Sequence, residues 1–257
     1  MNLILFAEEV LTLFLPSGDP RSRHVRDVLR CREGEGFDVG VIHGKRGRAV
    51  VEAWEADGCR LRFLWGEEPS AALPCALWVA FPRPTTARRI LREGASLGVA
   101  RMVFFGAERG EASYAQSRLW SGEGWREQII AGTEQAFHTR VPAVVQYTSL
   151  AEAIAREDAE VDATRIALDV YEAACPLREI GAGEGAVTMA VGPERGWSAK
   201  ERQQLRESGF QLAHLGERVL RSDTACVAAV SGLAQLRGWC DRPWCPEDRV
   251  NPSRYIP

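Results

Sequence analysis

Short apolar runs separated by polar turns fill the first quarter of the chain. The runs cover residues 37–42, 48–54 and 59–65, and the last of them alternates apolar with charged side chains. The polar stretches HGKRG and EADG stand between them. Runs of this length, bounded by glycine-bearing turns, are typical of strands joined in hairpins. The pattern predicts a β meander or a small β-barrel.

One helix is expected to interrupt these strands. Asp19 is suited to the N-cap and Pro20 to the first helical position. Val25, Val28 and Leu29 then follow at spacings that place them on one apolar face.

Beyond a linker at residues 66–74 the pattern changes to alternating strands and helices. Expected strands cover 76–81, 102–105, 141–147, 166–170, 187–191 and 212–215, and expected helices cover 85–97 and 124–137. Ser149 and Glu152 have the spacing of a capping box at the start of a further helix. Such alternation predicts an α/β fold, a mostly parallel sheet with helices on both faces. We therefore expect domains at 1–70 and 74–240 and a proline-rich tail at 241–257.

Composition and charge exclude some classes of protein but do not identify a function. The chain has 257 residues, a net charge of −3 and 26% charged residues, so any RNA contact must come from local basic patches. No apolar run approaches the ~18 residues of a membrane span, and Glu8 and Glu9 make the N-terminus a poor signal peptide. Seven scattered cysteines without a C-x-x-C pair predict reduced thiols in a cytoplasmic protein and no metal site.

Two segments near the C-terminus, VGPERGWSAKE (191–201) and LGERVLRSDTACVAAV (215–230), are the most informative. Each has an apolar run, a glycine-bearing polar turn and a helical stretch. In open α/β proteins ligands bind at that junction, and glycines such as Gly192 and Gly196 let main-chain amides approach a ligand closely. An ordinary strand-to-helix connection is the alternative. Two such turns close together favour a small-molecule site.

The same segments resemble the paired signature loops of the RsmE family, 16S rRNA uracil-N3 methyltransferases of the SPOUT superfamily. SRHVRDVLRCREGE (22–35), EGASLGVARMVFF (93–105), EQAFHTRVP (134–142) and ALDVYEAA (167–174) are similar to further family segments. The chain departs from the family pattern at Arg195, at Phe137 and His138, and at Asp223, where glycine, glycine and arginine, and glutamate are usual.

The resemblance implies a fold, a cofactor and partners. The fold is an N-terminal PUA-like β-barrel that binds RNA, joined to a C-terminal SPOUT domain with a trefoil knot. The activity is methylation of uridine N3 in 16S rRNA of the small ribosomal subunit by a cytoplasmic homodimer that uses S-adenosyl-L-methionine. The cofactor-binding residues it implies are Leu168, Tyr171, Glu172, Val191, Gly192, Pro193, Gly196, Leu215, Gly216, Arg218, Val219, Leu220 and Ala225.

Three polar residues are candidates for chemistry at the target base. Arg221 is suited to stabilising a developing uracil anion, and Asp223 or Glu194 to accepting the N3 proton. The alternative for Arg221 and Asp223 is an exposed charged pair at a helix start, where Asp is favoured by the helix dipole.

Arginines in the N-terminal part are candidates for RNA contact. Arg23, Arg26 and Arg30 have the i, i+3, i+7 spacing that places side chains on one helical face, as phosphate contacts require. A solvated charged face is the alternative.

A second hypothesis belongs to another functional class. The departures at Arg195, Phe137, His138 and Asp223 are also those of a divergent RNA-binding relative that has lost methyl transfer. An arginine at a glycine position with positive φ costs about 1–2 kcal/mol. A changed target nucleotide is the third reading.

Overall fold

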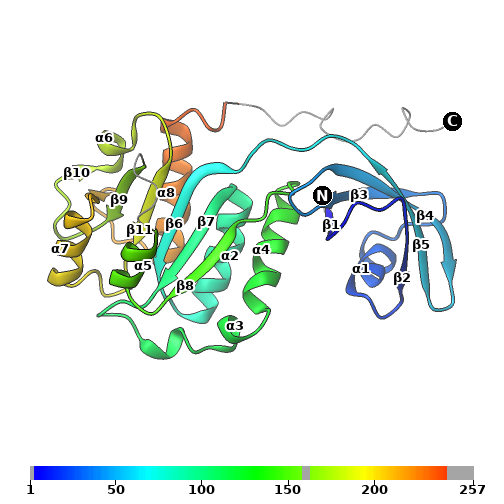
Figure 1. Cartoon of the computed structure of the whole chain (residues 1–257), viewed down its shortest axis with the longest axis horizontal. Helices are drawn as coiled ribbons and strands as arrows, with labels where there is room; N and C mark the ends of the chain where they lie inside the picture. Colours follow the sequence, from blue (N-terminus) through cyan, green and yellow to red (C-terminus); the bar gives the residue numbers. More distant parts are fainter. Residues whose placement is uncertain (1–2, 158–162, 242–257) are drawn as a thin grey trace. The chain divides into compact units, whose positions relative to one another are not determined.

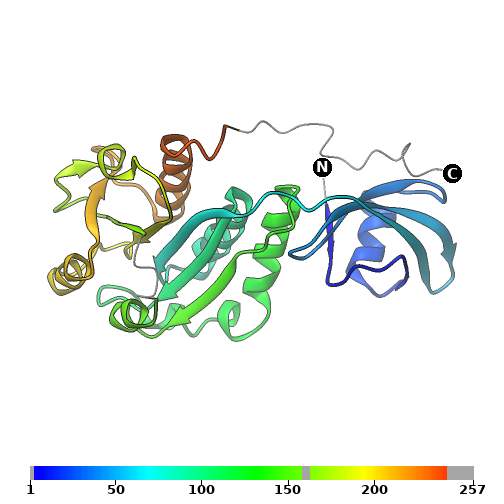
Figure 2. The same ribbon diagram turned by 45° about the horizontal axis from the view of Figure 1, so that its top comes forward.

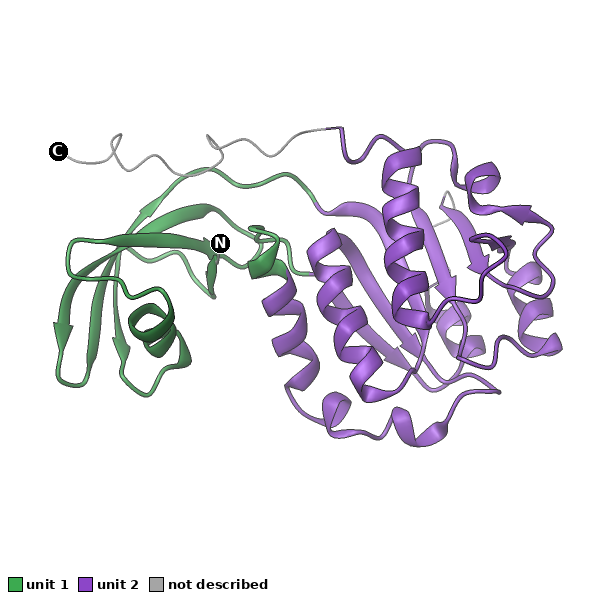
Figure 3. Cartoon of the chain, turned by 180° about the vertical axis from the view of Figure 1, so that it is seen from behind, with its two compact units in different colours: residues 1–71, 133–141, 243–257 green, residues 72–132, 142–242 purple. Residues whose placement is uncertain are grey.

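The computed structural model describes residues 3–157 and 163–241. The tail predicted from residue 241 lies outside the described residues, apart from Asp241. The chain forms two compact units, which Figure 3 distinguishes by colour. Among the described residues, unit 1 comprises 3–71 and 133–141, and unit 2 comprises 72–132 together with the rest of 142–241.

Unit 1 is built on a five-stranded mixed sheet (Figures 1 and 2). Its strand order is β1-β3-β4-β5-β2, with β1 parallel to β3 and the other neighbours antiparallel. The strands are β1 (Ile4–Phe6), β2 (Thr12–Pro16), β3 (Gly36–Val41), β4 (Arg46–Glu55) and β5 (Gly58–Trp65). The meander predicted at 37–65 is confirmed as β3, β4 and β5. The two short strands before it were not predicted, because neither run shows a clear period.

The helix of unit 1 departs from its prediction. Asp19 is the N-cap, and its side chain accepts a hydrogen bond from the main-chain N–H of Arg21, but α1 (Pro20–Arg23) lasts one turn. A π-helical turn, η1 (His24–Val28), continues it. The wider π turn breaks the α spacing, so Val25 is fully buried whereas Val28 is 60% exposed. The predicted apolar face is therefore wrong at Val28.

The segment 133–141, which comprises the last residues of α4 and most of the connection to β8, completes unit 1. The main-chain carbonyl of Thr139 accepts from the N–H of His43, and its hydroxyl donates to the carbonyl of Gly44. Glu134 accepts from the main-chain N–H of Leu5. Phe137 adopts φ +57° and is buried. The conformation explains why glycine is usual there, and burial of the ring offsets a strain of about 1 kcal/mol.

Unit 2 carries a seven-stranded parallel sheet, ordered β10-β12-β9-β11-β6-β7-β8 (Figure 1). Its strands are β6 (Leu73–Ala80), β7 (Val99–Phe105), β8 (Ala143–Tyr147), β9 (Thr164–Leu168), β10 (Cys175–Pro176), β11 (Val187–Val191) and β12 (Gln211–His214). Its helices are α2 (Pro84–Leu97), η2 (Ala112–Tyr114), α3 (Arg118–Ser121), α4 (Gly124–Gln135), α5 (Leu150–Glu157), α6 (Leu177–Gly181), α7 (Ala199–Glu207) and α8 (Ser222–Leu236). The predicted parallel α/β architecture is confirmed.

Helices cover both faces of this sheet. Leu150 of α5 and Leu205 of α7 pack in one buried cluster with Trp78 and Val103. Met102, the neighbour of Val103 in β7, points to the opposite face and lies against Gly94 of α2, which packs on α8. Both faces are buried, as a parallel sheet requires. Packing on both faces of the sheet fixes the register of the strands and therefore the positions of their carboxyl ends.

Candidate functional site

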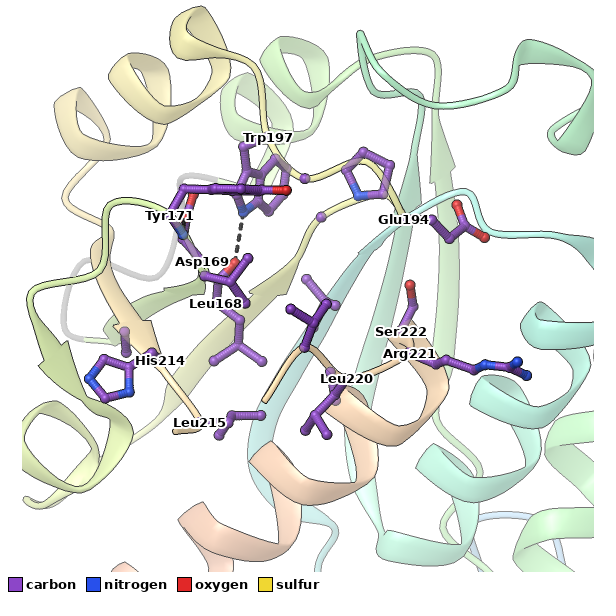
Figure 4. Close-up of a pocket in the computed structure, with 18 of the residues that line it drawn as sticks. Leu168, Asp169, Tyr171, Glu194, Trp197, His214, Leu215, Leu220, Arg221 and Ser222 are labelled. Atoms are coloured by element: carbon purple, nitrogen blue, oxygen red, sulfur yellow. Dashed lines mark hydrogen bonds between the residues drawn. The ribbon is translucent and has the colours of Figure 1, made fainter. Parts of the chain in front are cut away.

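Three neighbouring strands of the larger sheet end in glycine- or aspartate-bearing loops that surround one cavity (Figure 4). β12, β9 and β11 are adjacent in the sheet and parallel, so their carboxyl ends lie on the same edge. The loops after them supply its walls. The position agrees with the expectation that ligands bind at the carboxyl edge of such sheets.

The cavity has a volume of about 290 Å³, at the lower end of the range for small-molecule sites. Its lining is mostly apolar and main-chain. The lining residues are Leu168, Asp169, Val170, Tyr171, Val191, Gly192, Pro193, Glu194, Gly196, Trp197, Ala213, His214, Leu215, Arg218, Val219, Leu220, Arg221, Ser222 and Ala225. All but two of the predicted cofactor residues are among them; Glu172 and Gly216 are not.

The loop after β11 needs both of its glycines. A Cβ on Gly192 would lie 2.9 Å from the ring of Trp197, and a Cβ on Gly196 would lie 3.0 Å from the ring of Tyr171. Gly196 also has φ +70°, which side chains rarely adopt. Ser198 and Glu201 form the predicted capping box at the start of α7. The loop therefore presents main chain to the cavity between two aromatic rings.

Arg195 lies in this loop without the expected strain. The described non-glycine residues with positive φ are Arg30, His43 and Phe137. The prediction that Arg195 occupies a positive-φ position is therefore wrong, because the left-handed conformation falls on Gly196 instead. Its side chain is exposed.

The loop after β12 differs in its use of glycine. Gly216 has φ +109°, but a Cβ built on it meets nothing within 4 Å. Glycine is required there by backbone conformation rather than by close approach of a ligand. The main-chain N–H of Gly216 donates to Nδ1 of His214 at 3.1 Å. Val219 is 80% exposed at the rim.

The three candidates for chemistry do not share one environment. Arg221 and Glu194 line the cavity and lie at the same side of it in Figure 4. Asp223 is outside the lining, and its carboxylate lies 3.4 Å from the guanidinium of Arg89 in α2. Arg221 and Glu194 therefore lie at one rim of the cavity, and their charged ends point outward from it in Figure 4. Asp223 pairs with the neighbouring helix instead.

Arg83 and Tyr114 lie outside the cavity lining, but Arg83 interacts with the charge of Glu194, which is part of it. Nε of Arg83 donates to the phenol oxygen of Tyr114 at 3.1 Å. The Tyr114 phenol, and then Glu194 through its charge, raise the pKa of Arg83. Arg83 is the N-cap of α2 and Tyr114 is the last residue of the short η2, and neither position shows a periodic pattern, so sequence reasoning missed them.

The lining residues missed from the sequence are Asp169, Val170, Trp197, Ala213, His214 and Ser222. Asp169 and Trp197 directly follow the predicted cofactor-binding residues Leu168 and Gly196 in the sequence. Glu172, which was chosen, turns instead to the exposed guanidinium of Arg206 at 2.6 Å.

The candidate RNA-contacting arginines lie in unit 1 and are exposed. Arg26 pairs with the adjacent Asp27 at 3.0 Å. Arg30 follows the helical segment with φ +55°. The prediction that Arg23, Arg26 and Arg30 share one α-helical face is wrong, because the helix changes to a π turn at His24 and ends before Arg30.

Across residues 3–157 and 163–241, no group of three or more His, Cys, Asp or Glu side chains is arranged to hold a metal ion. In the same part of the chain no helix has the length and apolar character needed to cross a membrane.

Comparisons with known proteins agree with this geometry. A family model described as an RNA methyltransferase domain matches residues 69–234. The chain is 32% identical to ribosomal RNA small subunit methyltransferase E of Treponema pallidum (strain Nichols), over the whole of both chains. It is 26% identical to ribosomal RNA small subunit methyltransferase E 1 of Borreliella burgdorferi, over 89% of this chain and 95% of that protein. It also resembles the crystal structure of a ribosomal RNA small subunit methyltransferase E from Neisseria gonorrhoeae bound to S-adenosyl methionine, with a TM-score of 0.79, 29% identity and coverage of 92% and 98%.

Proposed function

The chain belongs to the RNA methyltransferase family that includes ribosomal RNA small subunit methyltransferase E, and from this premise we propose its reaction and substrate. It uses S-adenosyl-L-methionine to methylate 16S rRNA, and the methylated atom is N3 of a uridine. The observation that carries the proposal is the cavity at the ends of β9, β11 and β12. It is lined by apolar side chains and by main chain that glycine residues leave accessible.

The residues present fit the cofactor. Leu168, Leu215 and Leu220 supply apolar surface for an adenine ring, and the main chain around Gly192 and Gly196 offers amide and carbonyl groups to its edge. S-adenosylmethionine, when bound, would supply the methyl group of its sulfonium. The bond between that methyl carbon and sulfur would break as the bond to the uracil nitrogen forms. The solved relative bound to S-adenosyl methionine supports this assignment.

The chain's own residues orient and activate the base. Uracil N3 lies on the Watson–Crick edge, so the target nucleotide must be unpaired or turned out of its stack. Arg221 lies at the rim of the cavity, where it stabilises negative charge that develops on the uracil ring as the N3 proton leaves. Glu194, on the same side, accepts that proton. Asp223, which pairs with Arg89 outside the cavity lining, takes no part in this step.

The remaining assignments concern architecture and partners. Unit 1 is a PUA-like barrel that binds RNA, and unit 2 is a SPOUT domain whose chain forms a trefoil knot around the cavity. The similarity in fold to the solved relative of 29% identity supports this architecture. The protein acts in the cytoplasm on the small ribosomal subunit as a homodimer.

The competing hypothesis of an inactive RNA binder loses its main physical argument. The expected strain at Arg195 is absent. Phe137 and His138 belong to unit 1, and Asp223 lies outside the cavity lining. None of the four departures alters the cavity walls.

Calorimetry with S-adenosylmethionine and S-adenosylhomocysteine tests the proposal. We expect micromolar binding of both to the purified protein. Absence of binding at millimolar ligand would overturn the cofactor assignment and favour the inactive binder.

A further inference from the structure

A buried ion pair joins the loop after β9 to α7. Nε of Arg202 donates to Oδ2 of Asp169, and the two side chains are 6% and 1% exposed. A charged pair buried this completely is rare. Its desolvation offsets much of its attraction, so it is weak evidence of a contribution to stability.

Asp169 uses its other oxygen within the loop. Oδ1 accepts hydrogen bonds from the main-chain N–H groups of Tyr171 and Glu172. The carboxylate thus fixes the turn that carries Tyr171, while Arg202 fixes the carboxylate. One side chain connects the helix to the loop's main chain.

Arg202 also contacts the aromatic ring that this turn presents. Its guanidinium carbon lies 5.5 Å from the centre of the Tyr171 ring, within the range of a cation–π interaction. The ring is 70% exposed, yet it lies over Gly196, where a Cβ would meet it at 3.0 Å. Because the ring is largely exposed, its position depends on the hydrogen bonds of Asp169 within the turn and on the ion pair of Asp169 with Arg202.

A second arginine of α7 provides a contrast. Arg206 pairs with Glu172 of the same loop at 2.6 Å, but both side chains are more than two-fifths exposed. An exposed pair of this kind contributes little. Arg202 also reaches this carboxylate, with its Nη1 3.4 Å from Oε1 of Glu172, but its ion pair with Asp169 is the buried one.

We propose that Arg202 is a positioning residue that acts through Asp169 to hold Tyr171 as a wall of the cofactor cavity. Arg202 itself is absent from the cavity lining, so it touches neither cofactor nor RNA. The inference rests on the proposed function for the identity of the ligand, but the ordering of the loop does not depend on that identity.

Amide hydrogen exchange in the ligand-free protein tests the positioning directly. Arg202→Met should raise exchange at the amides of Tyr171 and Glu172 at least tenfold and leave the β9 and β11 amides unchanged. Arg202→Lys should fall between this variant and the wild type, because a lysine keeps the charge without the planar fork. Arg206→Met, the matched control, should change these amides less than twofold. Unchanged loop exchange in Arg202→Met, or an equal rise throughout unit 2, would overturn the proposal.

A double-mutant cycle measured by calorimetry with S-adenosylhomocysteine tests the consequence for binding. Asp169→Asn retains an oxygen for the turn but loses the charge that Arg202 requires. Each single variant should weaken binding about tenfold, and the double variant should weaken it no further, because the pair acts as one unit. Additive losses, or wild-type affinity in Arg202→Met, would refute the positioning role. If the wild type binds no S-adenosylhomocysteine, the proposed function fails, and the exchange experiment still decides the proposal.

Discussion

The indole Nε1 of Trp197 donates a hydrogen bond of 2.9 Å to the main-chain carbonyl of Leu168 (Figure 4). The bond joins the loop after β11 to the last residue of β9. It forms because Gly192 lacks a side chain, which leaves room for the indole ring beside the main chain. Two strand ends and one buried tryptophan therefore set the width of the cavity together.

Gly192→Ala should weaken S-adenosylhomocysteine binding. The new methyl group would lie 2.9 Å from the Trp197 ring, which cannot move without losing its bond to Leu168. Overpacking of this kind costs about 1–3 kcal/mol, or roughly five- to hundredfold in affinity. Titration calorimetry measures the loss. Gly122→Ala, where the nearest atom to a new Cβ is 3.6 Å away, is the control and should bind normally; equal affinity in both variants would remove Gly192 from the site.

Arg221→Ala should separate chemistry from binding. Arg221 is exposed at the rim of the cavity, so cofactor affinity should stay within about twofold. Loss of one preorganised charge donor corresponds to about 10²–10³ in rate. Single-turnover methyl transfer at saturating RNA measures it. Arg89→Ala, a neighbouring arginine that is 69% exposed, should retain turnover, and normal turnover in Arg221→Ala would refute its role.

Arg26→Ala should weaken RNA binding without affecting the cofactor. If Arg26 contacts a phosphate, the slope of log affinity against log salt should fall by about one unit. Arg30→Gly should have the same effect while relieving the strain of φ +55°. Fluorescence anisotropy with a 16S rRNA fragment at several salt concentrations measures both. Arg60→Ala, which removes a charge paired with Glu55, is the comparison; a wild-type slope in Arg26→Ala and Arg30→Gly would exclude these contacts.

His138 should make the stability of unit 1 depend on pH. Burial, and then the charges of Arg46 and Arg140, lower its pKa to about 4, below the ~6.5 of an unfolded chain. Its neutral Nδ1 accepts from the main-chain N–H of Arg140. Between pH 4 and pH 6.5 the unfolded state binds more protons than the folded state. The free energy of unfolding therefore has its full value above about pH 6.5 and decreases as the pH falls towards 4.

The loss is about 2 kcal/mol after allowance for the part of the ring that water reaches. Urea unfolding at pH 7 and pH 4.5 measures it. His138→Asn keeps an acceptor in place of Nδ1 but does not titrate, so it should show a smaller difference between the two pH values. An identical pH dependence in this variant and the wild type would contradict the assignment.

The sequence predicted the parallel sheet and most of the cavity because both depend on local pattern. Apolar runs followed by glycine turns specify strand ends, and Gly192, Gly196 and Leu220 stand inside such segments. Arg83 and Tyr114 are 31 positions apart and show no period, and only folding brings them into contact with each other.

Local pattern also failed where the backbone departs from regular geometry. The π turn at residues 24–28 displaced Val28 and separated Arg30 from Arg23 and Arg26. The contribution of segment 133–141 to unit 1 was invisible for another reason. Its contacts, such as that of Thr139 with Gly44, join residues 95 positions apart.

The most direct test of the account is the identity of the methylated nucleoside. The purified protein would be incubated with methyl-labelled S-adenosylmethionine and unmodified 16S rRNA, free or in small subunits. The rRNA would then be digested to nucleosides and analysed by mass spectrometry. The account predicts labelled 3-methyluridine with the wild-type protein and a large decrease with Arg221→Ala. A label on any other nucleoside, or no label on either substrate, would contradict it.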